Sequence, residues 1–76
     1  AIQAKIYPNP VNEVLQIEVE TMDNVHVTVM NAYGLIVENS KFNKLTSIDL
    51  SDYPAGLYLV RLEISGTYKT FKVLKK

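Results

Sequence analysis

The chain has 76 residues, carries eight basic and eight acidic side chains, and contains no cysteine. A chain of this length forms one domain and buries only about two-thirds of its unfolded surface, so it has little core to spare for an elaborate active site. The balanced charge excludes a global attraction to nucleic acid or anionic membranes, and the lack of cysteine excludes disulfides, thiolate nucleophiles and sulfur metal sites.

The first 30 residues predict three strands. Residues 3–7 alternate weakly and stop at Pro8-Asn9-Pro10, which predicts an edge strand followed by a rigid turn. Residues 14–20 and 25–30 alternate strictly between apolar and polar side chains, and with the turn at 21–24 we expect them to form a hairpin. The residues expected on their inner faces are Leu15, Ile17, Val19, Val25, Val27 and Val29.

The middle of the chain predicts two further strands. Asn31-Ala32-Tyr33-Gly34 has the residue preferences of a type I turn, and residues 35–38 begin a fourth strand after it. Residues 39–44 are polar except for Phe42, so we expect a connection whose aromatic ring covers one end of the core, with a short strand as the alternative. A fifth strand follows at 46–50, with Ile48 and Leu50 facing inward.

The last third of the chain is organised around Pro54-Ala55-Gly56, which predicts a sharp reversal with a positive φ at the glycine. The long strand that follows, residues 58–64, begins with Tyr58, whose placement resembles the tyrosine corner of Ig-like sandwiches, where the hydroxyl bonds back to upstream backbone. Ser65-Gly66 predicts a tight hairpin to a final strand at 68–74. Expected inner residues are Tyr58, Val60, Leu62, Ile64, Phe71 and Val73, with Arg61, Glu63, Tyr68, Thr70 and Lys72 facing outward.

These elements predict an all-β domain, an Ig-like antiparallel β-sandwich of about seven strands, although a barrel is hard to separate from it by pattern alone. We expect one domain over residues 1–76, with a packed unit at about 4–74. No apolar run approaches the roughly 20 residues of a membrane span, and the amino terminus lacks a secretion-signal pattern. If the domain is exported, another part of the polypeptide opens that route or the domain is itself the address.

The sequence offers no set of residues suited to catalysis or metal binding. His26 stands alone between valines, and we expect it to face solvent. The carboxylates Asp49, Asp52, Asp23 and Glu20 lie at turns, where aspartate commonly caps backbone. No triad can be built on Ser40, Ser47, Ser51 or Ser65. We therefore expect a protein that is not an enzyme, with no cofactor, no metal, no nucleic acid partner and no small-molecule substrate.

Tyrosines and lysines are the remaining candidates for binding. Two coplanar, exposed rings among the five tyrosines would give a platform for sugars. The one charge cluster is carboxyl-terminal and contains Lys69, Lys72, Lys75 and Lys76. These lysines have two interpretations, either protection of an edge strand against aggregation or recognition by an acidic receptor, and composition favours the first.

Four segments of the chain form a set of motifs, namely Ile6-Tyr7-Pro8-Asn9-Pro10, Gly34, Leu50 through Pro54-Ala55-Gly56-Leu57-Tyr58, and Lys72-Val73-Leu74-Lys75-Lys76. Together they resemble the type IX secretion system (Por secretion system) C-terminal sorting domain, type A. They occur in the family's order and at about its spacing, over nearly the whole chain. One departure is Leu35, which stands where the family often carries a basic residue.

The resemblance implies a non-catalytic Ig-like module at the carboxyl end of a secreted cargo, which it carries from the periplasm to an outer-membrane translocon of a Gram-negative bacterium. It also implies a sortase-like protease that cuts at or upstream of Ala1, after which the cargo is released or joined to surface lipopolysaccharide. Residues implied to be recognised are Pro8, Asn9, Pro10, Gly34, Gly56, Tyr58, Lys72, Lys75 and Lys76. Among these, we expect only the terminal lysines to be accessible to a partner.

Two other classes of function stay open at this stage. The first is an Ig- or fibronectin-like accessory module that binds carbohydrate or protein for a secreted enzyme, and the second is a structural spacer. Weak homodimers through edge strands also fit a small sandwich. Neither the cargo nor the receptor follows from the residues.

Overall fold

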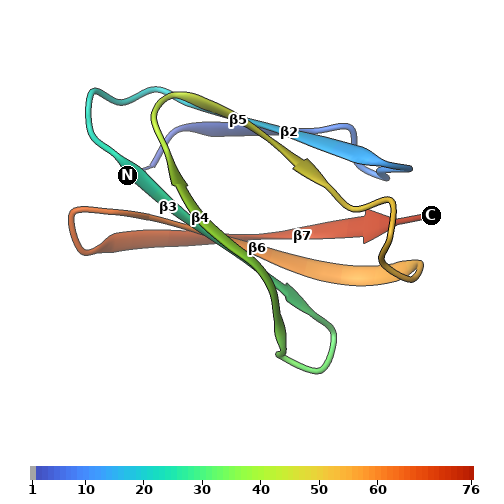
Figure 1. The fold of residues 1–76 in the computed structure, drawn as a ribbon. Helices are drawn as coiled ribbons and strands as arrows, with labels where there is room; N and C mark the ends of the chain where they lie inside the picture. The colour runs from blue at the N-terminus through green and yellow to red at the C-terminus, as the bar shows by residue number, and fades with distance from the viewer. Residues whose placement is uncertain (1) are drawn as a thin grey trace.

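The computed structural model describes residues 2–76, which form seven strands and no helix (Figure 1). This part of the chain accordingly has no helix with the length and hydropathy of a membrane span. In chain order the strands are β1 (Ala4–Tyr7), β2 (Val14–Val19), β3 (Val25–Asn31), β4 (Ile36–Phe42), β5 (Leu45–Asp49), β6 (Gly56–Ile64) and β7 (Thr67–Lys75). The all-β prediction is confirmed.

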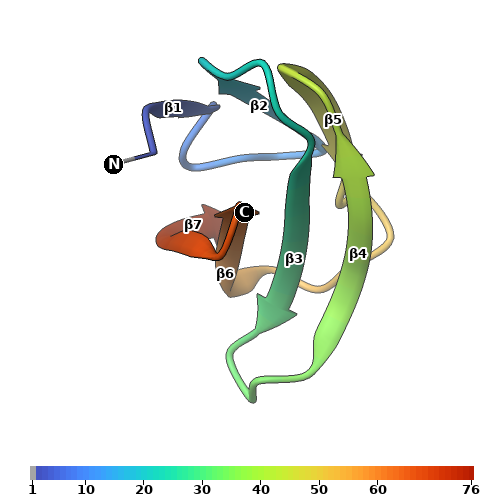
Figure 2. The ribbon, with the colours of Figure 1, turned by 90° about the vertical axis from the view of Figure 1, so that its left-hand side faces the viewer.

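The strands build two antiparallel sheets that pack face to face. One sheet has the order β1-β2-β5 and the other has the order β4-β3-β6-β7. Figure 2 shows the two layers, with edge strands β1 and β7 on the same side of the molecule. Placing the first, second and fifth strands in one sheet is the Ig-like grouping, and because the two sheets do not pair with each other, the fold is a sandwich.

The core lies between the sheets and is made of the residues that alternation predicted. Each strand gives one face to the core because successive side chains in a strand point to opposite sides. The predicted inner residues that are buried are Leu15, Ile17, Val19, Val25, Val27, Val29, Ile48, Leu50, Tyr58, Val60, Leu62 and Val73, and Ile64 and Phe71 pack against them. At roughly 1.5–3 kcal/mol for each fully buried large side chain, this cluster is the main stabilising feature of a domain without disulfides.

The predicted hairpin between the second and third strands is wrong. β2 pairs with β1 and β5, whereas β3 pairs with β4 and β6, so residues 20–24 cross from one sheet to the other. Alternation alone did not distinguish these arrangements, because two strands that face each other across the core show the same period as two strands that pair side by side.

The polar stretch after the fourth predicted strand is not a connection but a strand, so the alternative interpretation is the correct one. β4 continues to Phe42 and pairs with β3 along its length, with a β-bulge between Val29 and Met30. The strand is polar because it is the edge of its sheet and exposes Asn39, Ser40 and Lys41 to solvent, which edge strands commonly do. Phe42 packs against the core, as expected.

The predicted turns at residues 31–34 and 65–66 are confirmed. In the β3–β4 turn, the N–H of Gly34 donates to the carbonyl oxygen of Asn31 over 3.0 Å, and Oδ1 of Asn31 accepts from the N–H groups of Tyr33 and Leu35. In the β6–β7 turn, Ser65 and Gly66 both have positive φ, 49° and 81°, as a two-residue type I′ turn requires.

Candidate functional site

The segments that carry the predicted motifs meet at one end of the sandwich. Gly56 pairs with Lys75 across β6 and β7, and Val11 forms an isolated bridge with Lys75. On the other side of β6, Tyr58 pairs with Asn31, the first residue of the Gly34 turn. We call residues 8–11, 31–34, 54–58 and 72–76 the motif end. In Figure 1 the connection between β1 and β2, the start of β6 and the end of β7 lie on the right, near the carboxyl terminus, and the β3–β4 turn lies below them.

Asn9 connects the first motif to the last strand. The connection after β1 passes along the edge of β7, where the Asn9 Nδ2 donates to the carbonyl oxygen of Lys72 and Oδ1 accepts from the N–H of Leu74, each over 3.0 Å. The side-chain amide thus forms the two bonds that a neighbouring peptide group would form in a sheet. The peptide bonds preceding Pro8 and Pro10 are both cis.

Val11 extends this pairing by backbone bonds. Its N–H donates to the carbonyl oxygen of Leu74 over 2.8 Å, and its carbonyl oxygen accepts from the N–H of Lys76 over 2.9 Å. The Val11 side chain is fully buried in the core. The carboxyl-terminal half of β7 is therefore paired on both sides, although β7 is an edge strand of its sheet.

The corner before β6 has the predicted geometry. Gly56 has a φ of 148°, a conformation that side-chain-bearing residues rarely adopt. Tyr58 is only 4% exposed, and its hydroxyl donates to the carbonyl oxygen of Pro54 over 2.6 Å. The predicted tyrosine corner is therefore confirmed, and it fixes the point at which β6 starts.

A second tyrosine ties this corner to the edge strand β4. The Tyr53 hydroxyl lies 2.9 Å from both the carbonyl oxygen of Val37 and Oε2 of Glu38. The hydrogen bond to the Glu38 carboxylate, together with burial, raises the pKa of Tyr53 above its ordinary value. The corner and the β3–β4 turn enclose a small hollow of about 160 Å³ between them, so two of the motifs share one surface.

The terminal lysines differ in accessibility. Lys72 and Lys76 are exposed, but Lys75 is only 8% exposed and its Nζ donates to the carbonyl oxygen of Lys76 over 3.2 Å. The expectation that all of them are accessible is therefore wrong for Lys75. The reason is its register, because Lys75 lies on the same inner face of β7 as Phe71 and Val73.

Comparison with known proteins identifies the family of this chain. Residues 5–76 match the family of secretion system C-terminal sorting domains. The chain belongs to this family. The sorting domain is a C-terminal signal for type IX secretion, which exports proteins across the outer membrane to the cell surface or the extracellular space. None of the curated proteins compared with the chain matches it.

The motif end of the sorting domain also exposes apolar side chains that the sequence reasoning did not select. Leu57 and Leu74 are cross-strand partners on the outer face of the four-stranded sheet, 42% and 48% exposed, and Met30 and Leu59 pair beside them. The sequence feature that could have revealed them is the run of apolar residues at 57–60. Four successive apolar residues make the strand apolar on both of its faces. Contiguous exposed apolar patches often mark protein contact surfaces.

The other candidate residues of the sorting domain have structural partners. His26 is half-buried on the outer face of β3 and bonds to Oδ1 of Asn39, and residues 2–76 contain no cluster of three potential metal ligands. Asp49 caps its turn as expected, since hydrogen bonds from the Ser51 hydroxyl and backbone N–H lower the pKa of its carboxyl group. The capping role of this aspartate is therefore confirmed.

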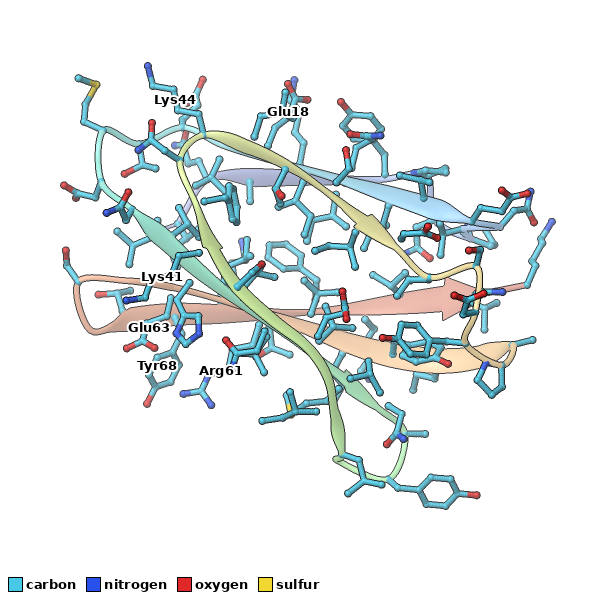
Figure 3. All side chains as sticks on the ribbon, in the orientation of Figure 1. Glu18, Lys41, Lys44, Arg61, Glu63 and Tyr68 are labelled. Carbon is cyan, nitrogen blue, oxygen red and sulfur yellow. The ribbon has the colours of Figure 1, made fainter. Side chains whose placement is uncertain are left out.

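The exposed tyrosines of the sorting domain do not form a sugar-binding platform within residues 2–76. Tyr7 lies on the three-stranded sheet, where its hydroxyl donates to Oε2 of Glu18 over 2.8 Å, and Tyr33 lies in the β3–β4 turn. Tyr68 lies on the outer face of the other sheet, with the Arg61 guanidinium 4.0 Å from its ring centre (Figure 3). These three rings are on separate surfaces.

Proposed function

We propose that the sorting domain delivers its cargo by presenting the motif end to the type IX translocon and that it catalyses no reaction itself. The observation that carries this proposal is the convergence of four motifs, from residue 8 to residue 76, on one end of a small sandwich. Exposed lysines and leucines lie at the same end, as is typical of surfaces bound by other proteins.

The position of the amino-terminal segment also supports presentation of the motif end to the translocon. Ile2 lies near Lys69, with which it lines a cavity, and Lys69 lies near the start of β7, whereas the motif end lies at the end of that strand. Figure 1 accordingly places the amino terminus and the carboxyl terminus on opposite sides of the molecule. A cargo that precedes this domain therefore leaves the motif end free to meet the translocon.

The recognition residues divide into two groups in this proposal. Lys72 and Lys76 are direct contacts, because their charges are exposed. The others shape or hold the surface that carries those contacts, since they form turns, the tyrosine corner and the paired edge of β7. This supporting group is Pro8, Asn9, Pro10, Gly34, Gly56, Tyr58 and Lys75.

The proposal includes the route of the cargo. The cargo reaches the translocon from the periplasm, and a sortase-like protease then removes the domain by cutting at or upstream of Ala1. The amino terminus lies on the side of the molecule opposite the carboxyl terminus. A linker between the cargo and the domain is therefore away from the translocon contact at the motif end. Two copies of the domain associate only weakly through edge strands, because lysines on β7 repel one another in such a pair.

A reporter fusion tests the proposed function. An inert fluorescent protein joined to the amino terminus of this segment is expected to reach the cell surface or medium of a type IX-competent strain and to stay inside a strain without the translocon. The same purified domain is expected to bind no sugar on a glycan array, which separates a sorting signal from an accessory carbohydrate module. Retention of the reporter in both strains would refute the proposal.

Replacing Lys72 and Lys76 together with alanine is expected to leave the melting temperature almost unchanged and to block export of the reporter. The melting temperature should stay the same because exposed charges away from ion pairs contribute little to folding. Export should fail because the translocon loses its charged contacts with the domain. The control is Lys41→Ala, because Lys41 is an exposed lysine on β4, away from the motif end. Wild-type export of the Lys72 and Lys76 variant would count against a contact role for these residues.

A further inference from the structure

The half of β7 that lies away from the motif end has an open edge. Asn9 and Val11 bond only to Lys72, Leu74 and Lys76, which shows that the even-numbered residues of β7 turn their backbone groups away from β6. By the same alternation, the backbone groups of Tyr68 and Thr70 point outward. Within residues 2–76 these groups have no hydrogen-bond partner.

The same edge already accepts an added segment in this molecule. Residues 9–11 occupy its carboxyl-terminal half, with the Asn9 amide taking the part of a peptide group and Val11 running parallel to β7. The bonds of this segment end at the carbonyl oxygen of Lys72, so the outward backbone groups from Tyr68 to the N–H of Lys72 form one continuous free stretch. An extended peptide pairs with a free edge of this kind by main-chain hydrogen bonds.

A cavity of about 630 Å³ borders this free stretch at Lys69, and the rest of its lining comes from residues 2–5, 18–20 and 44–45. Lys69 lines it because its pairing with Leu62 places it on the inner face of β7, and the buried side chains of Ile2 and Val19 also line it. Figure 2 shows β1 and β7, which both contribute to the lining, on the same side of the sandwich. The ionisable residues of the lining are three lysines and two glutamates, namely Lys5, Glu18, Glu20, Lys44 and Lys69.

We infer that residues 68–72 bind an extended, acidic segment of the secretion machinery, which adds to the four-stranded sheet as a fifth strand. Carboxylates on this segment complement Lys69 on the inner side of β7 and Lys72 on the outer side. The inference rests on the proposed function, because it names a partner for the same domain in export. It adds a second contact, at the end of β7 that the motifs do not reach.

Charge distinguishes this partner from a second copy of the chain. If the β7 strands of two copies paired, each strand would carry Lys69 and Lys72 next to the same lysines of its neighbour. Like charges on neighbouring strands destabilise such a pair. A segment with carboxylates has the opposite effect. The edge therefore favours an acidic strand over self-association.

Thr70→Pro tests the inference directly. Proline removes the outward N–H of residue 70 and blocks strand addition, but no bond between β6 and β7 depends on that group, and edge strands tolerate proline in this orientation. We expect the purified variant to melt close to wild type and its reporter fusion to lose export. Thr70→Ala keeps the N–H, and we expect it to be exported normally. Normal export of folded T70P would overturn the inference.

Lys69→Glu provides a second test that does not depend on the backbone. We expect it to reduce export, whereas Lys41→Glu, the same change on the opposite edge strand β4, has no effect. Wild-type export of K69E would overturn the acidic character of the segment. A wild-type dimer in sedimentation that T70P abolishes would instead assign the edge to a second copy. Failure of the wild-type fusion itself to be exported is a separate result, which refutes the proposed function.

Discussion

Asn9→Ala is expected to lower the free energy of unfolding by about 2 kcal/mol, because it removes two side-chain hydrogen bonds at roughly 0.5–1.5 kcal/mol each. In a domain of this size, 1 kcal/mol corresponds to roughly 4–8 °C in melting temperature, so thermal denaturation followed by circular dichroism resolves the effect. The loss is local in origin. The amide of Leu74, which donates to Asn9, should therefore exchange with solvent faster than the core amides of β3.

Asn12→Ala is the matched control for this prediction, because Asn12 is exposed in the same connection between β1 and β2. Its replacement should leave both the melting temperature and the exchange of the Leu74 amide unchanged. A Leu74 amide that stays protected in the Asn9 variant would show that the side chain does not hold β7. The motif would then act by direct contact with the translocon.

The fold was predictable to the extent that burial follows alternation. Leu15, Val27 and Leu62 are fully buried because a period of two fixes which face of a strand meets the core, and this holds whichever strand lies next to it. The turn at Asn31 was also readable, since its glycine and asparagine act through local geometry. Patterns within short segments were thus enough to predict the strands, their buried faces and the turn at Asn31.

Pairing between strands was less predictable because it depends on partners distant in the sequence. The wrong hairpin of β2 with β3 and the missed extent of β4 both reflect this limit. A polar edge strand has no apolar alternation to reveal it, so only its bonds to β3 identify residues 39–42 as a strand.

The site shows the same division between local and distant effects. The residues of the corner were assigned correctly because Gly56 and Tyr58 act on their own neighbourhood. The role of Asn9 was not visible, since its two bonding partners lie 63 and 65 residues away. Lys75 was misjudged for a related reason, because the inner face of β7 extends to its last residue.

Gly56→Val is expected to lower the free energy of unfolding by roughly 1–3 kcal/mol, because a β-branched side chain is strained at a φ of 148°. The space around the missing side chain is empty, so the cost is one of backbone conformation and not of collision. Against a total of roughly 5–10 kcal/mol for a domain of this length, the loss is large. Chemical denaturation at equilibrium measures it directly.

Ala55→Val separates backbone strain from the bulk of valine, because Ala55 is exposed in the same corner and does not have a positive φ. It should keep wild-type stability. The strain at residue 56 bears on export as well, because this residue pairs with Lys75 at the motif end. If valine at 56 costs no more than valine at 55, the corner relaxes without glycine, and the motif glycine must then be required for recognition by the translocon.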